Sequence, residues 1–258
     1  MKTPPVRIGA LRALLKEIAV SARDAKPLVV GGARELAPML RRDLGRDAAP
    51  GAVRDDAEPK GAALYVHVMG GADDAVELKR ARRARVPIVA VADARVDAVP
   101  HVLATDVVRL PPGQGFEVEA IADAIARRLG EDAAPLAGRV PVLRRAVAHE
   151  LIRLFSRKNG IVGAAVFIPG ADMPLLALNE LRLVLRLHQV YGLEVDPRER
   201  LPEIVATVGA SFGFRAVARE LLDLVPFAGW AIKGGVAYAG TRALGEATLR
   251  RLEPGGHG

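Results

Sequence analysis

The sequence contains no cysteine and very few aromatic residues. The absence of cysteine excludes disulfides, thiolate metal sites and a cysteine nucleophile. Aromatic residues make up only 4% of the 258 positions, so the cores have to be built from Leu, Val, Ile and Ala. This composition favours helices and parallel strands over an all-β sandwich, which uses more Tyr, Phe and Thr.

Sequence signals for secretion are also missing. Arg12, Lys16 and Glu17 interrupt the apolar stretch near the N-terminus, so no secretory signal is expected. The net charge is +7 and the isoelectric point is about 10.1, which favours an anionic partner. We expect an acidic membrane surface or a protein partner rather than nucleic acid, because no module interleaves basic residues with aromatics or glycines.

The motifs of nucleotide hydrolysis are absent. Counted from Gly31, the positions of Gly-Lys-Ser in a phosphate-binding loop hold Leu36, Ala37 and Pro38. The place of the guanine-reading N-K-x-D motif, on the third strand, holds Asp93 and Arg95 without an Asn-Lys pair. We therefore expect no catalysis and no cofactor.

A non-standard anion site is an alternative interpretation of the glycines that end two predicted strands. Its candidate residues are Gly31, Gly32 and Gly70. No metal site is expected, because the half-motif His149-Glu150 has Arg153 where a zinc-protease helix needs its second histidine.

The N-terminal half predicts an α/β domain. Apolar runs at 27–32, 64–69, 88–92 and 107–110 predict buried strands, with a short edge strand at Val53. Helical patterns at 34–44, 73–85 and 116–129 alternate with them, which is typical of a parallel sheet covered on both faces.

The C-terminal half predicts a helical bundle. Residues 130–138 have the composition of a linker, and helices are predicted at 140–158, ended by Asn159-Gly160, and at 174–191 and 202–222. The resulting division is an amphipathic helix in 1–25, which we expect to be docked on the protein, an α/β domain in 26–131 and a helical domain in 139–253. A basic membrane-surface helix is the alternative for the first segment.

Small residues recur at every fourth position of the apolar stretch 221–250. We expect them to form a ridge for close helix packing, against the predicted helix that contains Ala206, Gly209, Ala210 and Gly213. Self-association through such a surface is a further option. The ridge residues are Ala231, Gly235, Ala239, Ala243 and Ala247.

Polar and basic groups offer two interpretations, a solvated surface or a contact with an anionic partner. Asn179, Arg182, Arg186 and Gln189 form one polar stripe on an apolar helix, for which a solvated face is the simpler interpretation and a partner or lipid-headgroup contact the alternative. The basic groups at Lys79–Arg85, Arg144-Arg145 and 153–158 admit the same two interpretations.

No segment reaches the roughly 20 apolar residues that a membrane-spanning helix needs. Arg215 follows the apolar run 204–214, Lys233 lies within 224–240, and Pro169, Asp172 and Pro174 interrupt 160–178. We expect a cytoplasmic protein that is peripheral to the inner membrane or shallowly inserted in it.

The C-terminal half resembles the bacterial domain of unknown function six-nine-seven, found in YcjF-like inner-membrane proteins and attached to GTPase domains. The resemblance covers about 160–251 and rests on small-residue motifs. They are Ile168-Pro169-Gly170-Ala171-Asp172, Gln189-x-Tyr191-Gly192, Val225-Pro226-x-x-Gly229 and Ala239-Gly240-Thr241-Arg242-Ala243-Leu244-Gly245. It implies a helical, commonly membrane-associated domain.

The N-terminal half resembles a shortened, degenerate GTPase-like domain. The order of LYVHVMGG, a helix, PIVAVAD and a last helix looks like a GTPase fold without its switch segment, of which only 47–61 remains. Together the resemblances imply a non-catalytic, pseudo-GTPase-like scaffold at the membrane face or on a partner. A nucleotide- or anion-responsive protein and a soluble nucleic-acid-associated protein are the alternatives.

Overall fold

The structure is a computed structural model that describes residues 8–55, 59–96, 98–111, 113, 115–165, 173–193 and 229–253. The chain forms two compact units. The α/β unit comprises Arg23–Glu150 and Val190–Gly192, and the helical unit comprises Met1–Ala22, Leu151–Gln189 and Leu193–Gly258. This confirms the predicted class of a parallel α/β fold combined with a helical bundle.

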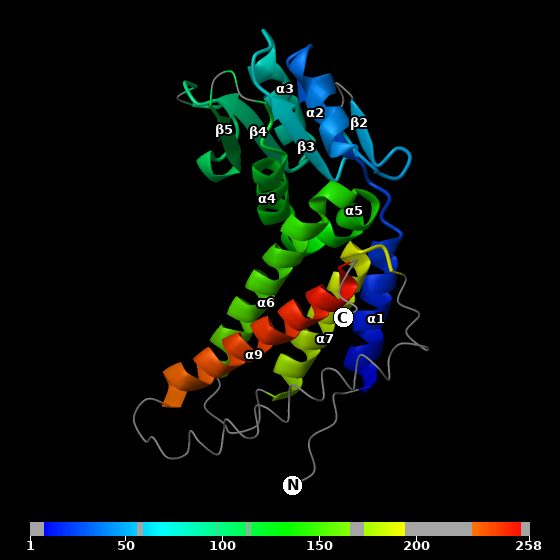
Figure 1. Cartoon of the computed structure of the whole chain (residues 1–258), viewed down its shortest axis with the longest axis vertical. Coiled ribbons are helices and arrows are strands. Elements are labelled where there is room, and N and C mark those ends of the chain that lie inside the picture. The colour runs from blue at the N-terminus through cyan, green and yellow to red at the C-terminus, as the bar shows by residue number, and fades with distance from the viewer. Residues whose placement is uncertain are drawn as a thin grey trace. The chain divides into compact units, whose positions relative to one another are not determined.

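A five-stranded, all-parallel sheet forms the centre of the α/β unit (Figure 1). Its strand order is β2-β1-β3-β4-β5, the order of flavodoxin-like doubly wound sheets. Every side chain of β3 is buried, as its continuous apolar run predicts. The strands are β1 (Leu28–Gly32), β2 (Val53–Asp55), β3 (Leu64–Val68), β4 (Ile88–Asp93) and β5 (Val107–Leu110).

Helices cover both faces of this sheet. Leu78 and Ala81 of α3 (Asp74–Arg83) pack in one core cluster with Tyr65 and Ile88. α2 (Leu36–Leu44) and α4 (Val118–Leu129) contact each other on the opposite face. The two faces arise because β1-α2-β2 and β3-α3-β4 are right-handed crossovers that run in opposite directions along the sheet.

The predicted linker at 130–138 is instead helical. It forms η2 (Gly130–Asp132) and α5 (Ala133–Arg139), followed by η3 (Pro141–Leu143). Four apolar side chains of α5 are buried, and Pro135 lies in its first turn, where a missing amide is tolerated. The Arg139 guanidinium donates to the backbone carbonyl oxygens of Ala25 and Lys26. The segment therefore belongs to the α/β unit, and the division falls near residue 150, within α6 (Arg144–Ala165).

The helical unit contains α1 (Ile8–Ala22), most of α6, α7 (Met173–Val190) and α9 (Gly229–Leu252) (Figure 1). The predicted stop at Asn159-Gly160 is wrong, because α6 continues through both residues. Asn159 is buried, and its amide donates to Thr241 Oγ1 at 2.8 Å and accepts from Asn179 Nδ2 at 2.8 Å. These bonds to α9 and α7 satisfy the side chain inside the bundle, so it does not need to cap a helix end.

Small residues do allow close packing of α9, but on another face than predicted. Gly235, Ala239, Ala243 and Ala247 are exposed, while the side chain of Ala231 and the predicted partner helix lie outside the described residues. A Cβ added to Gly163 of α6 would lie 2.8 Å from the Ala237 Cβ. The packing face of α9 is formed by Gly234, Ala237, Thr241, Gly245 and Thr248.

The amphipathic N-terminal helix packs within the helical unit. Leu14 and Ile18 of α1 are buried in a cluster with Leu181, Val184 and Leu185 of α7 and Leu244 of α9. This confirms the expectation of a docked helix. Among the described residues, no helix combines the length and apolar character that crossing a membrane requires.

Candidate functional site

The predicted anion-site glycines lie together at the point where the strand order of the sheet reverses. Gly31 and Gly32 end β1 and are in register with His67 and Val68 of β3, which Gly70 follows. In open α/β sheets, ligands bind in the crevice outside the carboxyl ends of the strands at such a point. This edge is therefore the first place to examine for a ligand site.

The structure uses these glycines for packing and turn geometry. A Cβ added to Gly31 would lie 2.4 Å from the Tyr65 hydroxyl oxygen, and Gly32 has a φ of +103°. The amides of Gly70 and Gly71 donate to the carboxylate of Asp74 at 2.9 and 3.1 Å. Because a carboxylate of the chain already accepts from these amides, the loop does not present them to a phosphate.

A buried polar cluster connects β3 to the start of α3. His67 is fully buried, and its Nε2 lies 2.9 Å from Asp74 Oδ1, an acceptor, so Nε2 is protonated. The Tyr65 hydroxyl lies 3.1 Å from His67 Nδ1 and 3.3 Å from Glu77 Oε2. In this network His67 has a structural role, because its bond to Asp74 fixes the first turns of α3 on the sheet.

Tyr65 gives this cluster a measurable pH dependence. Burial raises the pKa of Tyr65, and the Glu77 carboxylate raises it further. The unfolded chain releases this proton near pH 10, as about 10 is the pKa of a free tyrosine. The stabilisation by neutral Tyr65 is thus fully present below about pH 10 and is lost as the pH rises further. We expect the denaturation midpoint to fall more steeply above about pH 10 in the wild type than in Tyr65→Phe. Parallel profiles would contradict this.

The position of the guanine-reading motif is occupied by a local ion pair. Arg95 donates to Asp93 through Nε at 2.9 Å and through a second nitrogen at 2.8 Å. The hydrogen bonds from the side chain and amide of Arg95 lower the pKa of Asp93 to about 2. Asp97, the third polar residue there, lies outside the described residues. The Asp93 carboxylate is thus engaged by the chain itself.

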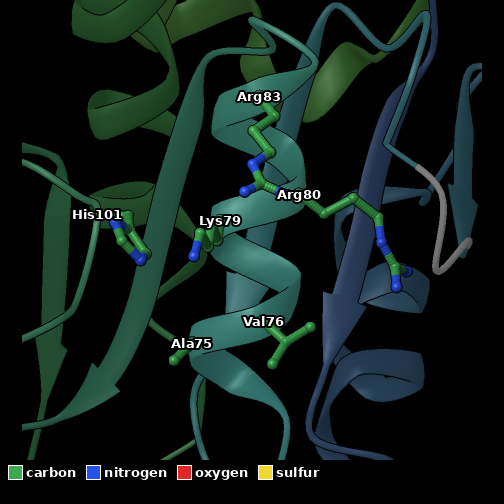
Figure 2. A pocket seen from close by; sticks show the side chains of 6 residues that line it. All are labelled: Ala75, Val76, Lys79, Arg80, Arg83 and His101. Carbon is green, nitrogen blue, oxygen red and sulfur yellow. The ribbon is translucent and has the colours of Figure 1, made fainter.

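A basic groove of about 510 Å³ runs along the length of α3, and we name it the α3 groove. Figure 2 shows Lys79 of α3 and His101 of the loop before η1 (Ala104–Asp106) facing one another, while Arg80 extends away from His101. No carboxylate is among the described residues that line it. Val76 on its edge is 57% exposed. The groove is lined by Ala75, Val76, Lys79, Arg80, Arg83 and His101.

A second cavity of about 430 Å³ lies beyond the end of α3, and we name it the Arg85 pocket. Arg82, Arg85 and Arg128 bring positive charge to it, and Asp106 contributes one carboxylate. Val86 and Ile88 are buried and contribute an apolar floor. His101 lines both the α3 groove and the Arg85 pocket, so the two cavities are neighbours.

The polar stripe on α7 contacts other helices of the same unit instead of an external partner. Arg186 is buried and donates to Ser21 Oγ of α1 at 2.7 Å and to Gln189 Oε1 at 3.0 Å. Arg182 and Arg186 both form ion pairs with Glu17 of α1. The structure therefore corrects both interpretations of Arg182, Arg186 and Gln189, the solvated face and the headgroup contact, because these side chains bond to α1.

The sequence predicts only part of this basic site. Lys79–Arg85 stands out as a charge run with two interpretations, but no pattern in the sequence gives a role to His101 or Arg128. These residues are distant in sequence, and only the β4–β5 connection and the end of α4 bring them to α3. Comparisons with family models, with curated proteins and with solved structures find no match to this chain, so its function is inferred from the residues themselves.

Proposed function

We propose that this chain is a non-catalytic, pseudo-GTPase-like scaffold that binds peripherally to an acidic membrane surface on the cytoplasmic side. The observation that supports this best is the α3 groove. Lys79, Arg83 and His101 line it without any carboxylate among the described residues, and the chain has a net charge of +7. A basic surface of this kind is attracted to anionic headgroups by about 1 kcal/mol for each Lys or Arg close to the membrane.

Exposed apolar side chains beside the groove favour a membrane over a nucleic acid. Val76 is 57% exposed and Leu103 of the neighbouring loop is 64% exposed. Apolar side chains next to basic ones insert at the boundary between headgroups and acyl chains. Single-stranded nucleic acids are instead held by aromatic side chains on which bases stack, and no Phe, Tyr or Trp lines the described part of the groove.

The interior of the α/β unit supports the non-catalytic part of the proposal. At the reversal of strand order, the amides of Gly70 and Gly71 are bonded to Asp74, and the side-chain position of Gly31 is filled by Tyr65. The sequence resemblance of 160–251 to a commonly membrane-associated domain agrees with the proposed location. In this proposal the helical unit anchors or supports the α/β unit at the membrane.

Removing two charges from the α3 groove tests the proposal. We expect Lys79→Gln/Arg83→Gln to weaken binding to phosphatidylserine-containing vesicles by roughly 30-fold, since two charges contribute about 2 kcal/mol. Binding is measured by co-sedimentation of the full chain at low and high salt. Vesicles of pure phosphatidylcholine serve as the reference surface.

Arg42→Gln/Arg46→Gln provides the matched control. It removes the same charge from α2 and the turn after it, on the opposite face of the sheet, where both side chains are exposed. We expect this variant to bind within about twofold of the wild type. Equal losses in the two variants would show that total charge and not the groove decides binding, and full recovery of the wild type in the supernatant at low salt would reject the proposal.

A further inference from the structure

The Arg85 pocket combines unneutralised positive charge with an apolar floor. Among the described residues, Arg82 and Arg85 have no ion-pair partner, while Arg128 Nε lies 3.3 Å from Asp106 Oδ2. Three guanidinium groups and one carboxylate leave a local charge of two positive units when His101 is neutral. A phosphomonoester carries nearly two negative charges at neutral pH and is the anion that matches this site.

Arg85 has a backbone conformation that its residue type disfavours. Its φ is +57°, in the left-handed region. The amide of Arg85 donates to the Arg82 carbonyl at 3.1 Å, and the amide of Val86 donates to the Ala81 carbonyl at 3.2 Å. These two bonds form a Schellman motif that ends α3, with Arg85 at the position where glycine is the usual residue. The chain thus has an arginine where glycine would make the fold more stable.

His101 repeats this feature on the other side of the pocket, with a φ of +65°. In the part of the chain that the structure describes, three non-glycine residues have a positive φ, and two of them line this pocket. Left-handed non-glycine residues are concentrated at ligand-binding sites, where function maintains a conformation that costs stability. Both observations indicate that these side chains are placed for a ligand.

We infer that the Arg85 pocket binds the phosphomonoester headgroup of a single acidic lipid of the phosphatidic acid class. Arg82 and Arg85 would donate to the phosphate oxygens, because a guanidinium can form two parallel bonds with one phosphate. The glycerol and the first acyl carbons would lie against Val86, Ile88 and the exposed Leu103. This inference rests on the proposed membrane association and adds a preference for one headgroup class.

The test uses a lipid that stays monomeric, so that surface attraction does not contribute. Dihexanoyl phosphatidic acid is titrated into the full chain by calorimetry, with dihexanoyl phosphatidylserine and inorganic phosphate as separate ligands. We expect the wild type to bind phosphatidic acid at least tenfold more tightly than either. Phosphate binding as tight as that of phosphatidic acid would overturn the lipid assignment, because the apolar floor would then contribute nothing.

Arg85→Gly separates binding from folding. We expect it to raise the melting temperature, since glycine has no Cβ to strain the left-handed position, and to weaken phosphatidic acid binding about tenfold or more. Arg42→Gln, which removes one charge from the opposite face, should change neither. Unchanged binding in Arg85→Gly would overturn the inference.

Two results distinguish this inference from the proposed function. If the wild type binds acidic vesicles but no phosphatidic acid monomer, this inference fails and the proposed function stands. If the monomer binds but the vesicles do not, the proposed function fails.

Discussion

Gly234→Leu is expected to destabilise the helical unit by about 3 kcal/mol or more, whereas Gly235→Leu, one residue further along the same helix, should leave it unchanged or slightly more stable. A Cβ at Gly234 would lie 2.9 Å from the Gly160 carbonyl oxygen and 3.1 Å from the Ala164 Cβ. The first contact is with backbone, so α6 and α9 would have to separate. At Gly235, an added Cβ would meet no described atom within 4 Å.

The two variants form a matched pair because residue type, helix and substitution are the same. Gly235→Leu replaces an exposed helical glycine, a change that favours the helix by up to about 1 kcal/mol. Unfolding is followed by the fluorescence of Trp230, the only tryptophan of the sequence, which lies in α9. A Gly235→Leu variant that is as destabilised as Gly234→Leu would show that the exposed ridge is also a packing surface.

The two faces of α9 explain which part of the helical unit the sequence could predict. The abundance of small residues indicated close helix packing, but the described helices pack on another face of α9 than the four-residue repeat of Ala239, Ala243 and Ala247. Four residues turn a helix by about 400°, so a strict repeat of four drifts by about 40° at each step. The buried set from Gly234 to Thr248 follows spacings of three and four, which average close to the helical period. Only the partner helix identifies the face that is used.

The α/β unit was easier to predict because its strands are defined by local apolar runs. All four predicted strands and the edge strand at Val53 are present with similar bounds. The sequence predicts a linker at 130–138 because its alanines and Pro135 give no clear pattern of apolar and polar positions. Four of its residues are nevertheless buried. The Arg85 pocket could not be predicted, since it joins the end of α3 to the loop at His101 and to Arg128 on α4.

Asp74→Ala is expected to destabilise the α/β unit by about 3 kcal/mol. The Asp74 carboxylate accepts from His67 Nε2 at 2.9 Å and from the amides of Gly70 and Gly71. Truncation leaves the N–H of a fully buried imidazole without its acceptor, and a buried donor without a partner costs about 1–3 kcal/mol. Asp73→Ala is the control, because Asp73 is exposed and its side chain does not cap α3, so its effect should stay within about 0.5 kcal/mol.

Two measurements distinguish this hydrogen-bond network from a general effect of charge at the start of α3. In Asp74→Ala, the amides of Gly70 and Gly71 should exchange hydrogen faster than in the wild type, while those of β4 change only with global stability. The double variant His67→Leu/Asp74→Ala should be less destabilised than the sum of the two single variants, because removing both partners leaves no buried donor unsatisfied. Additive losses would mean that His67 and Asp74 stabilise the fold independently. The loss in Asp74→Ala would in that case come from its bonds to the amides of Gly70 and Gly71 alone.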